Sequence, residues 1–249
     1  MVAFDKARYG IDSYQDWLKK ERLRVAEGLA IDCNTVETAE WPRLGARAAV
    51  LHLDGRGDFC NMILCELAPG KSTAPQRHLF EEVIYVVAGS GSTLLTLPNG
   101  ERRSFEWGER SLFAIPLNAE YRHFNGSGST RALLVSTTNL PMMLNLFHSE
   151  RFVFGNPFDF DDRIGKKEYF EGEGVLTLLR QGNDTWETNF VPDVGTIELP
   201  DFSDRGAGGG CLIFLLSDNS MHAHVSEMPA GTYKKAHRHG AGYHVMCVG

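Results

Sequence analysis

The sequence has few basic residues, no paired cysteines and no long apolar run, and each shortage excludes a class of protein. Its 25 Lys and Arg face 32 Asp and Glu, so the net charge of −7 leaves no broad basic face for nucleic acid. Five cysteines without a CxxC pair argue against a disulfide framework or a zinc ribbon and favour reduced thiols in a cytoplasm. Because no window approaches about 18 uninterrupted apolar residues and no leader is visible, we expect a soluble cytoplasmic protein with no membrane partner.

Short apolar runs separated by turns make up most of the chain. The 249 residues are 43% hydrophobic, enough to fill one large domain or two small ones, and the 26 glycines fall mostly between these runs. One helix is predicted, over residues 13–28, where Ser13 and Asp16 resemble a capping box. From about Gly45 onward, runs such as RAAVLHL and EEVIYVVAG predict an all-β barrel or sandwich of about a hundred residues.

An internal repeat sets the architecture. Residues 60–89 align with residues 221–249. In each copy an apolar strand leads to a glycine, Gly70 or Gly231, and after five further residues comes a triplet that ends in Arg-His. A second apolar strand ending in glycine follows in both copies. The repeat therefore places two histidine-bearing segments at equivalent positions.

The second copy offers three imidazoles. His237 and His239 are one residue apart, so on a strand both point to the same face. His244 follows the turn GAGY, which allows the next strand to return and bring a third imidazole toward the first two. Three neutral imidazoles suit a borderline divalent ion such as iron, manganese, copper, nickel or zinc. The alternative is three surface histidines on a polar hairpin.

The first copy offers a different set of donors. Gln76 replaces the first imidazole, His78 remains, and Glu82 can supply a carboxylate four residues later. On a later strand Tyr121 and His123 share one face, and His123 could complete a site with His78 and Glu82. Two imidazoles and one carboxylate with open positions are typical of non-haem iron(II) oxygenases. The alternative is a barrel without metal, in which both histidines are hydrogen-bonded core residues.

Three other polar side chains lie close to these donors in the sequence. Gln76 is an additional candidate donor to the metal through its amide oxygen. Tyr121 is a candidate pocket acid or hydrogen-bond donor, although a tyrosine on an inward face is often simply core. Glu81 is adjacent to Glu82 on a strand, so we expect it to point the opposite way and to be solvated.

These residues resemble the cupin family, whose first motif is G(X)5HXH(X)3–4E(X)6G. Every position except the first histidine is matched in the first copy, by Gly70, His78, Glu82 and Gly89, with Gln76 in the place of that histidine. The second copy matches at Gly231, His237 and His239, with His244 in the place of the glutamate. The second motif, G(X)5PXG(X)2H(X)3N, is looser, because Tyr121 stands where its histidine belongs. Gentisate- and salicylate-type dioxygenases similarly carry a histidine two residues before the asparagine, which supports His123 as the ligand.

The resemblance implies an all-β bicupin of two double-stranded β-helix (jelly-roll) barrels with a short N-terminal helix. We expect an N-terminal helix and arm over residues 1–44, a first barrel over 45–140, a connector over 141–205 and the start of a second barrel over 206–249. Since the second copy ends at the position equivalent to Gly89, we expect the chain to be a fragment of a protein of roughly 350 to 400 residues; the alternative is a partial barrel completed by another segment or subunit.

The leading functional hypothesis is a metal-dependent non-haem dioxygenase acting on a small organic substrate, for which the apolar lining suggests an aromatic compound. Fe(II) is the first choice of metal, with Mn, Ni, Cu or Zn as alternatives. Glu82 and Tyr121 are the candidate catalytic residues. A metal-dependent lyase, decarboxylase or isomerase, and a non-catalytic small-molecule-binding bicupin, stay open as alternatives because the family includes them all. The family also implies a homodimer.

Overall fold

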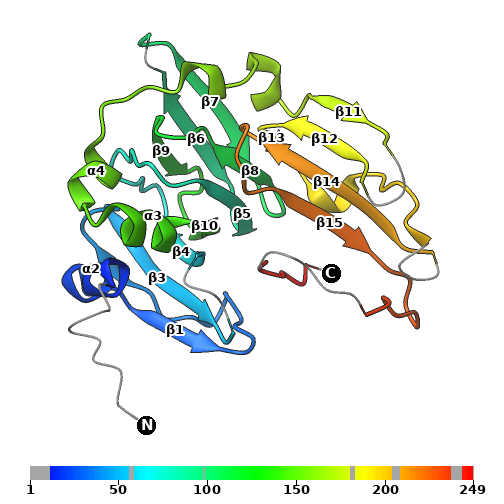
Figure 1. Ribbon diagram of the computed structural model, residues 1–249, viewed down its shortest axis with the longest axis horizontal. Coiled ribbons are helices and arrows are strands. Elements are labelled where there is room, and N and C mark those ends of the chain that lie inside the picture. The colour runs from blue at the N-terminus through cyan, green and yellow to red at the C-terminus, as the bar shows by residue number, and fades with distance from the viewer. Residues whose placement is uncertain are drawn as a thin grey trace.

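Two β-sheets, mostly antiparallel, form the first part of the molecule, and a third sheet lies beside them (Figure 1). The computed structural model describes residues 12–55, 59–97, 99–179, 183–203, 208–236 and 243–248. The helices are α2 (Ser13–Glu21), α3 (Leu140–Phe147) and α4 (Glu150–Gly155), with three short 3₁₀ turns, η1 (Asp161–Arg163), η2 (Lys167–Phe170) and η3 (Val194–Thr196). The strands are β1 (Val25–Gly28), β2 (Ala39–Trp41), β3 (Ala46–Leu53), β4 (Asn61–Leu67), β5 (Glu82–Ala88), β6 (Gly91–Thr96), β7 (Arg102–Trp107), β8 (Leu112–Ile115), β9 (Glu120–Asn125), β10 (Ala132–Thr138), β11 (Val175–Thr177), β12 (Thr185–Thr188), β13 (Phe190–Val191), β14 (Gly210–Leu216) and β15 (Ala223–Glu227).

Strands β4 to β10 wind back and forth between two sheets. One sheet contains the order β4-β10-β5-β8 and the other the order β7-β6-β9, so the chain crosses from one sheet to the other between β5 and β6, β7 and β8, β8 and β9, and β9 and β10. Isolated bridges from Ser72 and Gln76 extend the second sheet beyond β9. This winding is a double-stranded β-helix, so the predicted all-β jelly roll is confirmed.

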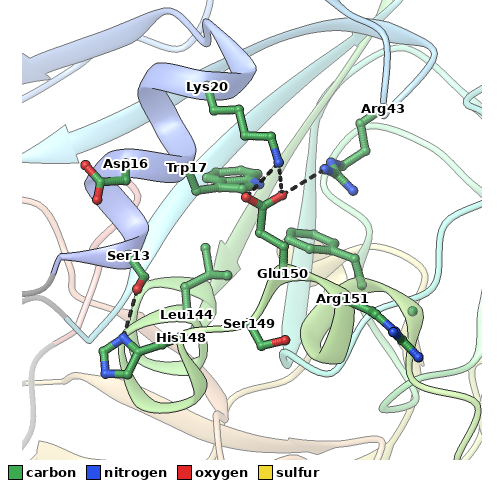
Figure 2. A pocket seen from close by; sticks show the side chains of 12 residues that line it. Ser13, Asp16, Trp17, Lys20, Arg43, Leu144, His148, Ser149, Glu150 and Arg151 are labelled. Carbon is green, nitrogen blue, oxygen red and sulfur yellow. Dashed lines mark hydrogen bonds and ion pairs between the residues drawn. The ribbon is translucent and has the colours of Figure 1, made fainter.

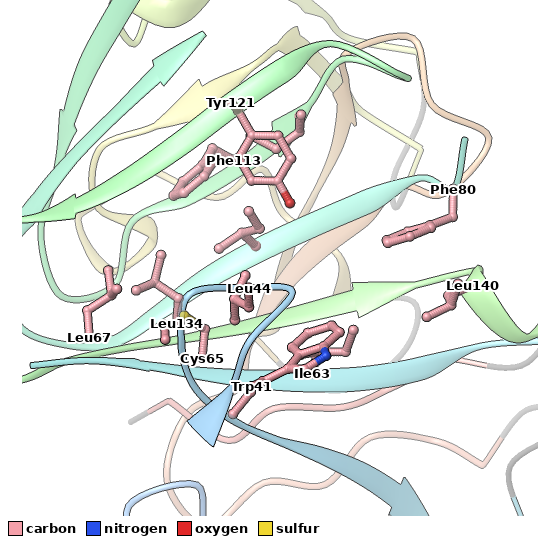
Figure 3. Packing of buried hydrophobic residues seen from close by; sticks show 14 of the residues in the cluster. Trp41, Leu44, Ile63, Cys65, Leu67, Phe80, Phe113, Tyr121, Leu134 and Leu140 are labelled. Atoms are coloured by element: carbon pink, nitrogen blue, oxygen red, sulfur yellow. The ribbon is translucent and has the colours of Figure 1, made fainter. Parts of the chain in front are cut away.

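Strand β4 shows why the apolar runs are nearly continuous. Ile63 and Cys65 point into the barrel and join its main core, whereas Met62 and Leu64 pack in a separate cluster on the outer face of the sheet. Figure 3 shows Ile63 and Cys65 among the aromatic and aliphatic side chains of the interior. A strand buried on both faces needs apolar residues at successive positions, which a half-exposed strand does not.

Glycine is required at one close crossing inside the barrel. A Cβ atom on Gly91 would lie 2.0 Å from the carbonyl oxygen of Phe124 and 2.5 Å from the ring of Trp107. Gly91 begins β6, which pairs with β7 on one side and β9 on the other. Because any side chain would push these strands apart, this position depends on the missing Cβ.

The internal repeat is visible in the strand pairing. Strand β3 pairs antiparallel with β4, placing Arg47 opposite Glu66, and β14 pairs antiparallel with β15, placing Gly210 opposite Glu227, the repeat equivalent of Glu66. Each pair also has a parallel strand on its outer edge, β1 on β3 and β12 on β14. The two halves of the chain therefore contain the same three-stranded unit, in agreement with the internal repeat.

The third sheet, β11-β12-β14-β15, packs against the outer face of the first barrel. Val83 and Ala114, from β5 and β8, share an apolar cluster with Leu212, Phe214 and Leu216 of β14. Strand β13 pairs with β8, so part of the predicted connector completes the first sheet. Within the described ranges, residues 228–236 and 243–248 form no strand.

The helix predictions are partly wrong. Helix α2 ends at Glu21 instead of Gly28, because Arg22 adopts a left-handed conformation that closes it, and Val25 begins a strand. Its N-cap is Asp12, whose side chain accepts a hydrogen bond from the backbone of Gln15. Helices α3 and α4 were not expected. No helix in the described parts of the chain is long and apolar enough to cross a membrane.

Candidate active site

Four polar side chains selected from the sequence are buried together inside the first barrel. His78 lies in the segment just before β5, Glu82 is the first residue of β5, and Tyr121 and His123 lie on β9. All four have less than a tenth of their surface exposed. The rings of Tyr121 and His123 are 5.0 Å apart, because residues two apart on a strand share a face.

His78, Tyr121 and Glu82 form a hydrogen-bonded triangle. The Tyr121 hydroxyl donates to Glu82 Oε2 over 2.6 Å and lies 3.0 Å from His78 Nε2. His78 Nε2 is also 3.3 Å from the same carboxylate oxygen. On its other side, His78 Nδ1 lies 2.9 Å from the carbonyl oxygen of Phe80, which can only accept, so Nδ1 carries the hydrogen. This fixes Nε2 as the nitrogen that faces Glu82.

Phe80 covers the imidazole as well as anchoring it. Its ring lies parallel to His78 with a centroid separation of 3.5 Å and an interplanar angle of 3°. The Phe80 ring itself is 5% exposed and packs edge-on against Phe154 of α4. The stack excludes water from one face of His78 and fixes the ring orientation relative to Glu82.

The electrostatics of the triangle are strongly perturbed. Burial alone raises the pKa of Glu82, but the hydrogen bond and charge of His78, with bonds from Ser136 and Tyr121, outweigh it and lower the pKa to about 2. Burial and the neighbouring Glu82 carboxylate raise the pKa of Tyr121 well above its usual value. Burial, together with Glu82, raises the pKa of Cys65 to about 12. Glu82 is therefore a buried anion, and a metal ion bound beside it would balance its charge.

His123 is held separately. Its Nδ1 lies 2.8 Å from Thr93 Oγ1, which in turn accepts a hydrogen bond from Trp107 Nε1 over 3.0 Å. Burial lowers the pKa of His123 to about 4, so the imidazole is neutral at pH 7. With Nδ1 engaged, Nε2 is the nitrogen left for a ligand.

The donor chemistry fits a divalent ion, whereas the arrangement assembles only two of the three expected donors. His78 Nε2 and Glu82 Oε2 are adjacent, and Nε2 of a neutral His123 suits the third position. Yet among the residues that the structure describes, no group of three or more His, Cys, Asp or Glu side chains is placed to hold a metal. The Tyr121 hydroxyl, bonded to both His78 and Glu82, lies at the third corner of the triangle.

The remaining predicted ligands are less defined. The side-chain nitrogen of Gln76 donates to the backbone carbonyls of Arg43, Ala74 and Pro75, so its amide is held against two loops. His237 and His239 lie outside the described residues. His244 is described and partly buried. The three-histidine site of the second copy therefore stays a prediction.

Glu81 was expected to be solvated, and this is wrong. Its side chain is buried, and its carboxylate accepts hydrogen bonds from Arg163 Nη2 (2.9 Å), from the Ser220 backbone (2.9 Å) and hydroxyl (2.7 Å), and from the Met221 backbone (3.0 Å). Burial alone raises the pKa of Glu81, but these bonds outweigh it and lower the pKa. The partners lie up to 140 positions away, so no local sequence signal could have revealed them.

Comparisons with known proteins give one relative by sequence and a set of structures of low similarity. No family model matches the chain. A 5-aminosalicylate 1,2-dioxygenase from Comamonas sp is 30% identical over 93 residues, which cover 36% of this chain and 23% of that enzyme. The matched part thus spans less than a quarter of that enzyme's length.

Solved structures similar to this chain include a 7S globulin and two oxalate decarboxylases. The globulin of Momordica charantia has a TM-score of 0.37 at 16% identity and covers 44% of this chain and 33% of its own. The oxalate decarboxylase of Bacillus subtilis has a TM-score of 0.37 at 16% identity, with coverages of 50% and 31%. That of Lactobacillus farciminis has a TM-score of 0.36 at 16% identity, with coverages of 43% and 31%.

Proposed function

The chain has the cupin fold, and from this premise we propose that it is a metal-dependent cupin enzyme, a non-haem dioxygenase that acts on a small aromatic acid. The observation that carries the proposal is the buried pair of His78 and Glu82, 3.3 Å apart inside the first barrel, with the neutral His123 nearby. The sequence similarity to a 5-aminosalicylate 1,2-dioxygenase supports the reaction class and the type of substrate.

His78, Glu82 and His123 would hold the ion, with Fe(II) as the first choice and Mn, Ni, Cu or Zn as alternatives. When bound, such an ion supplies a Lewis-acidic centre with open positions for small molecules. Binding requires the Tyr121 hydroxyl to give up its place between His78 and Glu82. Gln76 and the second set of His237, His239 and His244 are further candidate ligands.

The chain's own residues would prepare the site. The Phe80 carbonyl holds His78 in the tautomer that directs Nε2 inward, and the Phe80 ring keeps water from its face. Tyr121 holds a proton 2.6 Å from Glu82 and can donate it to an acceptor brought into the barrel. The raised pKa of Tyr121 keeps its hydroxyl protonated at neutral pH, as a hydrogen-bond donor requires.

A second candidate function is a non-oxidative cupin lyase, decarboxylase or isomerase. The Tyr121 hydroxyl beside Glu82 favours it, because such a reaction needs a hydrogen-bond donor or proton donor inside the barrel. In this reaction the Tyr121 hydroxyl, released from Glu82 when the metal binds, would exchange a proton with the substrate that the metal orients. Oxygen consumption distinguishes the two reactions, since only the dioxygenase uses dioxygen.

The domain boundaries belong to the same proposal. We assign residues 1–44 to an N-terminal helix and arm, residues 45–140 to the first barrel, residues 141–205 to a connector and residues 206–249 to the start of a second barrel. The repeated three-stranded unit supports two related halves. A homodimer and a cytoplasmic location stay predictions.

The experiment that tests the function uses anaerobically purified protein reconstituted with Fe(II). We expect bound iron and oxygen consumption with 5-aminosalicylate or a related hydroxybenzoate. His78→Ala should lower both, whereas His148→Ala, a change at the end of α3 outside the barrel, should lower neither. Failure to bind iron or manganese would contradict both enzymatic functions and leave the non-catalytic binding protein. Metal binding with turnover but without oxygen uptake would favour the lyase or isomerase.

A further inference from the structure

A cleft of about 650 Å³ lies outside the barrel, between α2 and the pair α3 and α4 (Figure 2). Its volume is within the usual range for sites that bind small molecules, roughly 300 to 1,000 Å³. The walls come from three helices and the loop that carries Arg43, so segments far apart in the sequence build one hollow. The proposed function does not use this cleft.

The cleft contains a buried hydrogen-bond donor without an acceptor. Trp17 is 1% exposed, and its Nε1 has no hydrogen-bond partner among the described residues. The indole nitrogens of Trp41 and Trp107, by contrast, donate to Glu21 and Thr93. Because a buried unsatisfied donor costs about 1–3 kcal/mol, a ligand that brings an acceptor to Trp17 would recover that free energy.

Charged side chains of both signs line the cleft. Lys20, Arg43 and Arg151 line it together with the carboxylates of Asp16 and Glu150. Figure 2 shows Lys20 and Arg43 directed toward Glu150, with Lys20 Nζ 2.8 Å and Arg43 Nη2 3.6 Å from Oε2. Arg43 is also paired with Glu21, so three carboxylates balance the three cations, and none of the ion pairs found among the described residues includes Arg151.

Apolar side chains supply the remaining wall. Trp17 and Phe154 lie nearly parallel, with centroids 5.8 Å apart and an interplanar angle of 17°, and Leu144 lies beside them in the cleft. The Arg43 guanidinium lies 4.4 Å from the centre of the Phe154 ring. The same cleft therefore combines an apolar surface with cations and an unused N–H group.

We propose that this cleft binds a small organic carboxylate with an apolar body. The carboxylate would accept from Trp17 Nε1 and lie beside the Lys20 and Arg43 cations, and the body would pack on Leu144 and Phe154. Glu150, at the first turn of α4 and one-third exposed, can turn outward as the ligand's carboxylate takes its place. The site is independent of the metal chemistry inside the barrel.

The test follows the indole N–H signals of ¹⁵N-labelled full-length protein during titration with benzoate, in chelator-treated and metal-loaded samples alike. The signal that is missing in Trp17→Phe identifies Trp17. We expect benzoate to move this signal downfield in a saturable way, because its proton gains an acceptor. Benzamide, the neutral equivalent, and inorganic phosphate, an anion without an apolar body, should each bind at least about tenfold more weakly.

Two neighbouring lysines on α2 provide a matched pair of variants. Lys20 lines the cleft, whereas Lys19 is exposed and does not. Lys20→Gln should weaken benzoate binding by about tenfold, and Lys19→Gln should leave it within about twofold. Equal affinity for benzoate and benzamide, an unmoved Trp17 signal, or equal effects of the two variants would each overturn the proposal. None of these results depends on whether the barrel binds a metal.

Discussion

Replacing Glu81 with alanine tests how much the contacts between the first barrel and the segments at Arg163 and Ser220 contribute to the stability of the fold. The substitution removes one carboxylate and with it four hydrogen bonds, from Arg163, Ser220 and Met221, and leaves the buried Arg163 charge without its counter-ion. The Glu81 and Arg163 side chains are 7% and 18% exposed, so solvent screens their ion pair only weakly. Removing one partner of such a buried pair typically costs about 3–5 kcal/mol, a large part of the 5–15 kcal/mol that stabilises a domain.

Urea unfolding at pH 7 measures this cost as a change in the free energy of unfolding. Glu81→Ala should lose about 3–5 kcal/mol, and Glu81→Gln should lose less because its amide oxygen still accepts. Glu106→Ala, at an exposed position on β7, is the control and should stay within about 0.5 kcal/mol of wild type. A loss below about 1 kcal/mol for Glu81→Ala would refute the reasoning, since the four bonds would then contribute little.

The pH dependence gives a second check on the same residue. The folded pKa of Glu81 lies below the ordinary value of 4.5, so its carboxylate stabilises the fold above pH 4.5. That stabilisation is lost as the pH falls from 4.5 through the folded pKa. The stability difference between wild type and Glu81→Gln should therefore be full at pH 7 and shrink in acid. A difference that is constant down to acid pH would contradict this assignment.

Three further predictions concern the barrel interior. Tyr121→Phe should fold and bind Fe(II) or Co(II) more tightly than wild type in an anaerobic titration, because the hydroxyl no longer bridges His78 and Glu82. Weaker binding would contradict this and show that the hydroxyl supports the metal. Thr93→Val should lose about 1–3 kcal/mol in urea unfolding, because Trp107 Nε1 loses its acceptor. The pH dependence of the free energy of unfolding tests His123, because the unfolded chain protonates its histidine more readily than the folded barrel does. As the pH falls from 6.5 to about 4, wild type should lose up to about 3 kcal/mol of this free energy relative to a variant without a titrating side chain at position 123.

The sequence was most informative where spacing alone determines geometry. The period of two on a strand predicted that Tyr121 and His123 share a face, and both are buried. The motif spacing selected His78 and Glu82 as partners, and their side chains lie 3.3 Å apart. The internal repeat predicted related halves, and the common strand register of β3-β4 and β14-β15 agrees with it. These features are local or periodic, so they can be found without knowing the fold.

Contacts between distant segments could not be predicted in the same way. Glu81 follows the strand alternation, but the residues that bury it come from a turn about 140 positions later. Helix α3 has Pro141 in its first turn, and its sequence, LPMMLNLF, is apolar at almost every position. It therefore lacks the alternation of apolar and polar faces by which a surface helix is predicted. The Tyr121 hydroxyl lies between two candidate ligands because of side-chain geometry that residue spacing does not specify.

Metal binding by the first barrel is the measurement that tests the central proposal most directly. Anaerobic Fe(II) titration, followed by elemental analysis, should be compared between wild type and the double variant His78→Ala/Glu82→Ala, with His148→Ala as the control. We predict that the double variant loses the iron bound by the first barrel while the control retains it. Equal iron content in wild type and the double variant would contradict the proposal, because the buried pair would then have no part in holding the metal.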